Sequence, residues 1–260
     1  MKPSLSISLL QTATHWHDPE ANQEMFAQMF EGLPPSTDLV VLPEMFSTGF
    51  TMSSRQVAQT MSGDTVAWMV DQAARLDKWL CGSVVIEEAG EFYNRFIAAD
   101  PRGVQVTYDK RHRFRMAGEH NYYSAGGAAV QFEVAGWKVC PMVCYDLRFP
   151  VWFRNRDSYD VLVCVANWPA PRQAAWNTLL RARAIENQAY CAGVNITGTD
   201  GNEVPYTGGS AVYTPDGEVL AESFDASAVI NIELSAQRLL ELREAFPVWQ
   251  DADHFELVDE

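Results

Sequence analysis

The side chain best suited to nucleophilic chemistry in this sequence is that of Cys144. It ends the apolar run Trp137–Val143, which predicts a strand, and polar and cationic residues follow it at once. A helix opening at Pro150, together with these cations, would lower the pKa of the thiol and favour the reactive thiolate. The alternative is a core residue, because free cysteines are among the most buried side chains in proteins.

A cysteine nucleophile needs a base, and none of the histidines stands in a sequence context typical of papain-like or caspase-like cysteine hydrolases. Glu44 could serve instead. It follows the strand-like run Leu39–Leu42, with apolar Met45 and Phe46 behind it, and a carboxylate among apolar neighbours suits proton transfer near neutrality. Taken alone, Glu44 is more simply interpreted as a solvated loop residue.

Cationic residues gather in segment 107–126, namely Lys110, Arg111, Arg113 and Arg115. Lys110 directly follows the strand-like run Val104–Tyr108, so its ammonium could reach a site at that strand end and stabilise an oxyanion. For the three arginines a solvated basic loop is the simpler interpretation. Glu119 in the same segment could orient a cation or form a surface ion pair.

Composition narrows the class of protein. The net charge of −15 over 260 residues argues against the basic face that nucleic-acid binding uses. Five scattered cysteines fit free thiols in a reducing compartment, so we expect a cytoplasmic protein. The sequence contains no apolar segment of membrane-spanning length. The length suits one domain.

The pattern of apolar runs and turn signals predicts mixed sheets covered by helices on their outer faces. Predicted strands are 5–10, 39–42, 80–86, 92–98, 104–108, 130–134, 137–143, 161–166, 190–196, 210–213, 218–221 and 228–232. Apolar spacing predicts helices over 19–31, 64–76, 150–156, 176–188 and 235–245. Turn signals at 100–103 and 215–217 predict hairpins.

Read in order, the three reactive segments resemble the nitrilase superfamily of carbon–nitrogen hydrolases. LPEMF carries the family's glutamate at Glu44, YDKRHRF its lysine at Lys110 and VCYDLRFP its cysteine at Cys144. GEH supplies the family's second glutamate at Glu119. The stretch ANWPAPRQAAW and the later YTGGSAVYTPDGEV are also similar to the family. The resemblance spans nearly the whole chain, and the CYDLRFP and ANWP signatures look most like its omega-amidase branch.

The resemblance implies an α/β fold, a four-layer α-β-β-α sandwich of the nitrilase type, as one domain over residues 1–260. It also implies a homodimer, in which a C-terminal tail at about 246–260 could pack at the interface. No cofactor is expected, because the glycine pairs 126–127 and 208–209 match neither the P-loop nor the dinucleotide-binding fingerprint. No metal is expected, because Cys140 and Cys144 lack a second ligand pair.

The resemblance further implies an amide substrate that reacts through a cysteine thioester. Glu44 would take the proton of Cys144, while Lys110 and the backbone N–H of Tyr145 would hold the oxyanion. Glu119 would orient Lys110 or the substrate. The substrates of the omega-amidase branch, 2-oxoglutaramate and 2-oxosuccinamate, carry a carboxylate far from the scissile amide.

Such a carboxylate calls for a cation other than Lys110. Arg172 is the first choice and Arg148 the second, although Arg148 could instead pair with Asp146 or a helix end. Phe46, Tyr122 and Trp168 could line the pocket or simply pack in the core. Two alternatives to omega-amidase stay open, an amidohydrolase acting on N-carbamoyl or other linear amides and a catalytically silent scaffold of the same fold.

Overall fold

The computed structural model describes residues 1–156 and 159–257 and contains two sheets. The six-stranded sheet has the order β13-β1-β2-β3-β4-β5, and the seven-stranded sheet has the order β10-β11-β9-β8-β7-β6, with β12 paired to β11. The strands are β1 Ser4–Gln11, β2 Leu39–Val41, β3 Trp79–Glu88, β4 Glu91–Asp100, β5 Gly103–Asp109, β6 Phe132–Val134, β7 Trp137–Val143, β8 Val161–Val165, β9 Tyr190–Val194, β10 Thr197–Thr199, β11 Pro205–Tyr213, β12 Val219–Phe224 and β13 Ala228–Ser235.

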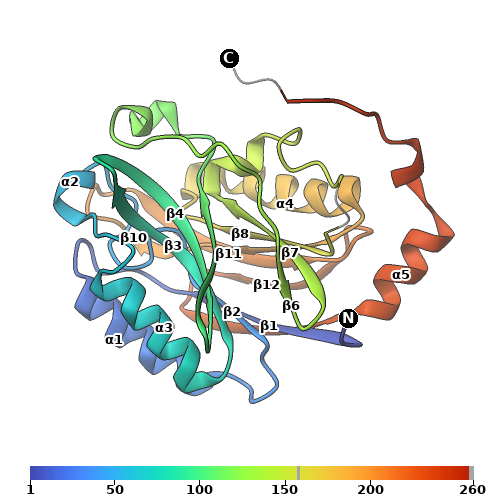
Figure 1. The fold of residues 1–260 in the computed structure, drawn as a ribbon, viewed down its shortest axis with the longest axis horizontal. Helices are drawn as coiled ribbons and strands as arrows, with labels where there is room; N and C mark the ends of the chain where they lie inside the picture. Colours follow the sequence, from blue (N-terminus) through green and yellow to red (C-terminus); the bar gives the residue numbers. More distant parts are fainter. Residues whose placement is uncertain (157–158, 258–260) are drawn as a thin grey trace.

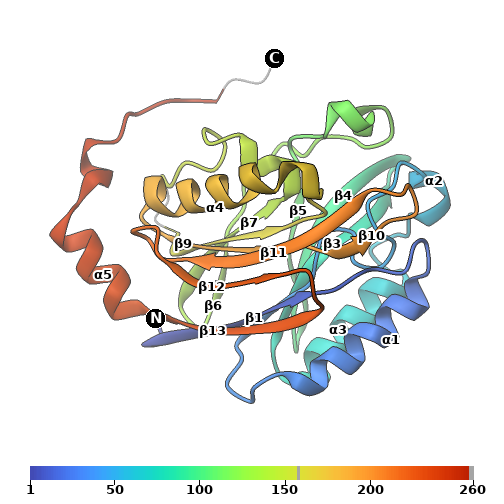
Figure 2. The same cartoon turned by 180° about the vertical axis from the view of Figure 1, so that it is seen from behind.

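The two sheets lie face to face, with helices on the outside (Figures 1 and 2). The helices are α1 Pro19–Met29, α2 Ser54–Val57, α3 Asp64–Leu76, α4 Gln173–Asn187 and α5 Ala236–Ala245. In the figures α1 and α3 cover the outer face of the first sheet and α4 covers the second, so the predicted four-layer sandwich is confirmed. In the described part of the chain, no helix is long and apolar enough to cross a membrane.

Strands β2, β8 and β9 are buried at every position because both of their faces are covered. In β2, Leu39 and Val41 point into the core between the sheets, while Val40 points to the core beneath α1 and α3. This division follows from the alternation of side chains along a strand. Between the sheets, Phe132 of β6 stacks on Trp79 of β3, with ring centroids 5.4 Å apart.

The sheet topology brings several strand ends to one edge of the sandwich. In the first sheet β2 and β3 are parallel, and β5 is antiparallel to β4, which is antiparallel to β3. The residues beyond β2 and β5 therefore leave the same edge. In the second sheet β7 and β8 are parallel, with Val143 level with Val165. Glu44, Lys110, Cys144 and Asn167 follow these four strands.

Most predicted elements agree with the structure, and both predicted hairpins are present between β4 and β5 and between β11 and β12. Helix α3 has the predicted bounds, and α4 begins three residues earlier than predicted. The short elements α2 and β10 were not predicted.

The predicted helix over 150–156 is wrong. Residues Pro150–Phe153 form a single turn, closed by a hydrogen bond from the Phe153 N–H to the Pro150 carbonyl. The chain beyond it is held by other partners: Asn155 donates its side-chain amide to the carbonyls of Tyr159 and Asn187. A side chain that satisfies the backbone in this way competes with a helix.

Candidate active site

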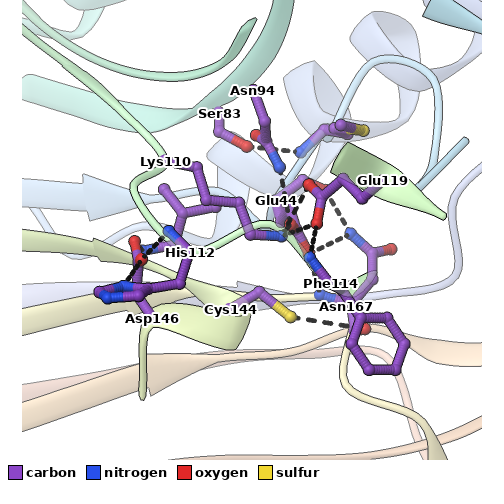
Figure 3. Close-up of polar contacts among 12 residues, drawn as sticks. Glu44, Ser83, Asn94, Lys110, His112, Phe114, Glu119, Cys144, Asp146 and Asn167 are labelled. Carbon is purple, nitrogen blue, oxygen red and sulfur yellow. Dashed lines mark hydrogen bonds and ion pairs between the residues drawn. The ribbon is translucent and has the colours of Figure 1, made fainter. Parts of the chain in front are cut away.

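A buried lysine bridges two buried carboxylates where β2 and β5 end (Figure 3). Lys110 Nζ lies 2.9 Å from Glu44 Oε1 and 2.9 and 3.0 Å from the two carboxylate oxygens of Glu119. The three side chains are almost inaccessible to solvent. Glu119 is held in turn by the N–H of Phe114, which donates to it. The structure thus brings Glu44 together with Lys110 and Glu119, which belong to a separate segment of the sequence.

The charged groups of this cluster shift one another's pKa values. Burial alone would lower the pKa of Lys110, but the negative charges of Glu119 and Glu44 raise it well above its usual value. Burial and the nearby charge of Glu44 raise the pKa of Glu119, against the opposing effect of Lys110. Lys110 therefore remains an ammonium at neutral pH, which is the form that can stabilise an oxyanion.

Hydrogen bonds fix Glu44 at both carboxylate oxygens and at its backbone carbonyl. Asn94 of β4 donates its side-chain amide to Oε1 over 2.7 Å, and the Asn167 backbone N–H donates to Oε2 over 2.8 Å. The Asn167 side chain also donates to the Glu44 carbonyl, over 2.6 Å. Glu44 is therefore a locked carboxylate rather than a solvated loop residue.

Cys144 occupies a strained turn immediately after β7. Its φ of +47° lies in the left-handed region, which costs a residue with a side chain roughly 1–3 kcal/mol. Its Sγ lies 3.8 Å from the Asn167 carbonyl oxygen. This geometry is typical of a nucleophile presented between a strand and a helical turn.

The expectation of a lowered pKa at Cys144 is wrong. Burial and then the charge of Glu44 raise the pKa of the thiol well above its usual value, and Lys110 opposes them only in part. The helical element here is a 3-10 turn, Cys144–Arg148, which starts at the cysteine itself and not at Pro150. The thiol is therefore protonated at rest, so attack on a carbonyl requires a base to take the proton.

A pocket of about 390 Å³ opens above Cys144 and Lys110. Its walls combine charged and polar residues with five aromatic ones, Phe50, Phe114, Tyr145, Trp168 and Tyr206. Ligand sites are usually apolar hollows of this size with a few polar groups. In the described part of the chain no histidine lines this pocket, and the base that interacts with the thiol is the carboxylate of Glu44.

Two arginines, Arg148 and Arg172, stand in the pocket wall. The Arg148 guanidinium lies over the Trp168 ring at 4.9 Å, and that of Arg172 over the Phe114 ring at 5.1 Å. Neither forms an ion pair within residues 1–156 and 159–257. Asp146, the suggested partner of Arg148, is instead bonded to Tyr108 and His112.

The structure sorts the remaining predicted pocket residues. Trp168 and Tyr145 line the pocket. Phe46 lies elsewhere: it is buried among Phe26 and Trp68 in the core beneath the helices, because the chain turns at Met45, whose φ is +43°. Tyr122 is 49 % exposed and is not part of the pocket wall.

Sequence reasoning missed Asn94, considered Asp146 only as a partner of Arg148, and did not single out Asn167. Asn167 lies in the ANWP signature, which gave some signal for it. Asn94 stands inside an ordinary strand pattern and gave none. Within residues 1–156 and 159–257, no group of three or more potential ligands could hold a metal ion.

Residues 6–244 match the carbon–nitrogen hydrolase family. The chain belongs to this family. Its relatives include the omega-amidase YafV of Escherichia coli strain K12, 48 % identical over 98 % of this chain and 99 % of YafV. The 2-oxoglutaramate amidase of Bacillus subtilis strain 168 is 34 % identical over 95 % of this chain and 96 % of its own. The resemblance to the nitrilase superfamily and its omega-amidase branch is thereby confirmed.

Among solved structures, a family member from Xanthomonas campestris, XC1258, superposes with a TM-score of 0.96. It is 44 % identical and covers 98 % of this chain and 99 % of its own. Its crystal structure carries an arsenic adduct in the active site.

Replacing Lys110 with methionine should destabilise the protein by about 3–5 kcal/mol at neutral pH, because two buried carboxylates then face each other without a cation. The loss should shrink as the pH falls and protonation of the carboxylates removes their repulsion. Chemical denaturation at several pH values measures both effects.

Lys2→Met is the matched control, because Lys2 forms an ion pair with Asp38 at the surface, with its side chain 46 % exposed. Its loss should cost no more than about 1 kcal/mol. Equal losses for the two variants would contradict the stabilising role of the buried cluster.

Proposed function

We propose that this protein is an omega-amidase that converts 2-oxoglutaramate or 2-oxosuccinamate to the 2-oxo dicarboxylate and ammonia. The observation that carries the proposal is the placement of two stacked arginines in the wall of the pocket that contains Cys144 and Lys110. The identity to omega-amidase YafV over nearly the whole chain supports the same substrate class.

In the proposed mechanism Glu44 takes the proton of Cys144 as the sulfur attacks the amide carbon. Such a base is required because the thiol is protonated at rest. Lys110 and the backbone N–H of Tyr145 hold the negative charge that develops on the carbonyl oxygen. Glu119 holds Lys110 in place.

The attack gives a tetrahedral intermediate. When this intermediate collapses, the carbon–nitrogen bond breaks and a thioester remains on Cys144. Glu44 returns its proton to the departing nitrogen, which leaves as ammonia. The same carboxylate then takes a proton from a water molecule, whose oxygen attacks the thioester. The product carboxylate leaves, and the thiol recovers its proton.

The two arginines account for the preference for an oxo acid. A planar guanidinium matches a carboxylate with two hydrogen bonds, and stacking on Trp168 or Phe114 leaves its N–H edges available. Two unpaired cations also disfavour an ammonium group next to the carboxylate, as in glutamine and asparagine. We assign Arg172 the carboxylate, with Arg148 beside it.

Cys144→Ala should lower kcat by more than about 10⁴-fold on every substrate while the protein stays folded, because only the nucleophile is lost. Cys191→Ala is the control, since Cys191 is a buried strand residue outside the pocket. Ammonia release measures turnover and circular dichroism measures folding. Activity of Cys144→Ala close to that of the unmodified protein would refute the nucleophile assignment.

The substrate panel for this assay is 2-oxoglutaramate, 2-oxosuccinamate, glutamine, asparagine and N-carbamoyl amino acids. The 2-oxo amides should react with the highest kcat/KM. Faster hydrolysis of an N-carbamoyl substrate would favour another amidohydrolase activity. A lack of ammonia from the whole panel would favour a silent scaffold.

Arg172→Met should raise the KM for 2-oxoglutaramate by about 10- to 100-fold with a smaller change in kcat, because the lost contacts bind a part of the substrate that does not react. Arg148→Met should have a smaller effect. A neutral linear amide without a carboxylate is the control, and its kcat/KM should not change. Equal losses on both substrates would contradict a carboxylate site.

We also propose that the chain acts as one domain in a cytoplasmic homodimer, with the tail from residue 246 at the interface. In Figures 1 and 2 the described part of this tail rises from α5 along the side that α4 covers. It contacts the body of the protein, since Gln188 donates to the Phe246 carbonyl over 2.7 Å and the Arg156 guanidinium lies 5.1 Å from the Phe255 ring. Phe246 and Trp249 of the tail and Leu240 of α5 are 65, 58 and 56 % exposed. The five cysteines are all buried thiols, in keeping with a reducing compartment.

Deletion of residues 246–260 should shift the protein from dimer to monomer in sedimentation velocity, because these exposed apolar side chains would lose their partner. Full-length protein that sediments as a monomer would contradict the proposed dimer.

A further inference from the structure

Asp146 lies two residues after Cys144 and is completely buried. No lysine or arginine pairs with it among the described residues, so its charge is held by hydrogen bonds from the elements around the active site. It does not line the pocket and has no place in the proposed chemistry. A buried carboxylate is costly unless its oxygens are saturated with donors.

The donors to Asp146 come from two separate segments. From the second sheet, the Val143 N–H donates to Oδ2 over 3.1 Å. From the end of β5, the Tyr108 hydroxyl donates to the same oxygen over 2.9 Å. The His112 N–H donates to Oδ1 over 2.9 Å, and His112 Nδ1 lies 2.8 Å from that oxygen. A carboxylate only accepts, so Nδ1 carries a proton.

These donors flank the two residues proposed to act on the substrate. In the sequence, Cys144 lies between Val143 and Asp146. Lys110 lies between Tyr108 and His112, two residues from each. The carboxylate therefore ties the end of β5 in one sheet to the end of β7 in the other. Figure 3 shows Asp146 and His112 on the opposite side of Lys110 from Glu119.

The same contacts hold Cys144 in its positive-φ conformation. The Val143–Asp146 bond closes the turn around the cysteine, which otherwise has no reason to leave the extended region. On the other side, the His112 ring stacks on Phe149 with centroids 3.9 Å apart and planes 6° apart. His112 is thus fixed against the residues that follow the nucleophile.

We propose that Asp146 is a positioning residue that sets the distance between the Cys144 thiol and the Lys110 ammonium. The inference rests on the roles proposed above for these two residues. Asparagine has almost the same shape but only one acceptor oxygen. If its N–H group replaces Oδ1, it faces the two donors of His112, and if it replaces Oδ2, it faces those of Val143 and Tyr108. Either orientation breaks at least one link to the segment at the end of β5.

Asp146→Asn should lower kcat for 2-oxoglutaramate by roughly 100-fold and leave KM within a few fold, because misplacement of reacting groups by about 1 Å has effects of this size. It should also slow the alkylation of Cys144 by iodoacetamide by at least about tenfold, since the thiol moves relative to its base. Mass spectrometry of the modified peptide follows this rate without any turnover.

Asp160→Asn is the matched control. Asp160 is another buried aspartate, just before β8 and at its other end from the pocket, and it accepts bonds from the Lys138 N–H and from Arg243. Its substitution should lower stability but change neither kcat nor alkylation. If Asp146→Asn and Asp160→Asn match in both readouts, the positioning role is refuted.

Tyr108→Phe keeps the test decisive if Asp146→Asn fails to fold, because it removes one hydroxyl from the same carboxylate. It should slow alkylation of Cys144 severalfold, and a rate equal to that of the unmodified protein would overturn the proposal. The alkylation rates also separate the two proposals. If no amide yields ammonia, the proposed function fails, while the comparison of alkylation rates still tests the role of Asp146.

Discussion

A lysine ammonium held between two carboxylates, out of reach of water, is the interaction on which the rest of this structure depends. Removing such ions from water costs several kcal/mol each, and only close and well-oriented partners offset that cost. Lys110 has those partners because β2 and β5 end at the same edge of one sheet and Glu119 returns from the loop beyond. A fold that let these strand ends move would leave buried charges without partners.

The second sheet contributes further groups that hold Glu44, and also the cysteine that faces it. Glu44 follows a strand of only three residues, yet the Asn167 backbone and side chain, from beyond β8, fix both its carboxylate and its carbonyl. Cys144 comes from the neighbouring β7. A thiol whose pKa burial raises can still act as a nucleophile, provided that a base is held against it.

The sequence predicted those parts that depend on local patterns. Apolar runs followed by a charged or reactive residue placed Glu44, Lys110 and Cys144 at strand ends, and the amphipathic spacing of α3 gave its bounds. The helix from Pro150 failed because partners distant in the sequence, such as Asn187, hold that segment in another conformation. Asn94 was not predicted, and Asp146 was considered only as a partner of Arg148, because an asparagine or aspartate shows its hydrogen-bond partners only after folding.

The direction of the Cys144 pKa was misjudged for a similar reason. The nearby cations are visible in the sequence, but the degree of burial is not, and burial is the larger effect. The place of Phe46 was likewise left open between the pocket and the core, because a sequence does not reveal toward which layer the chain turns after Glu44.

The groups proposed to act on the substrate are divided between the two sheets: Glu44 and Lys110 follow strands of one, and Cys144 follows a strand of the other. Stacked sheets are held about 10 Å apart only by the side chains between them. The stacked rings of Trp79 and Phe132 belong to that layer and help to set the separation of the sheets. In such an arrangement the packing of the core also determines the alignment of the reacting atoms. A small shift of one sheet against the other would leave the protein folded but would separate the groups that react.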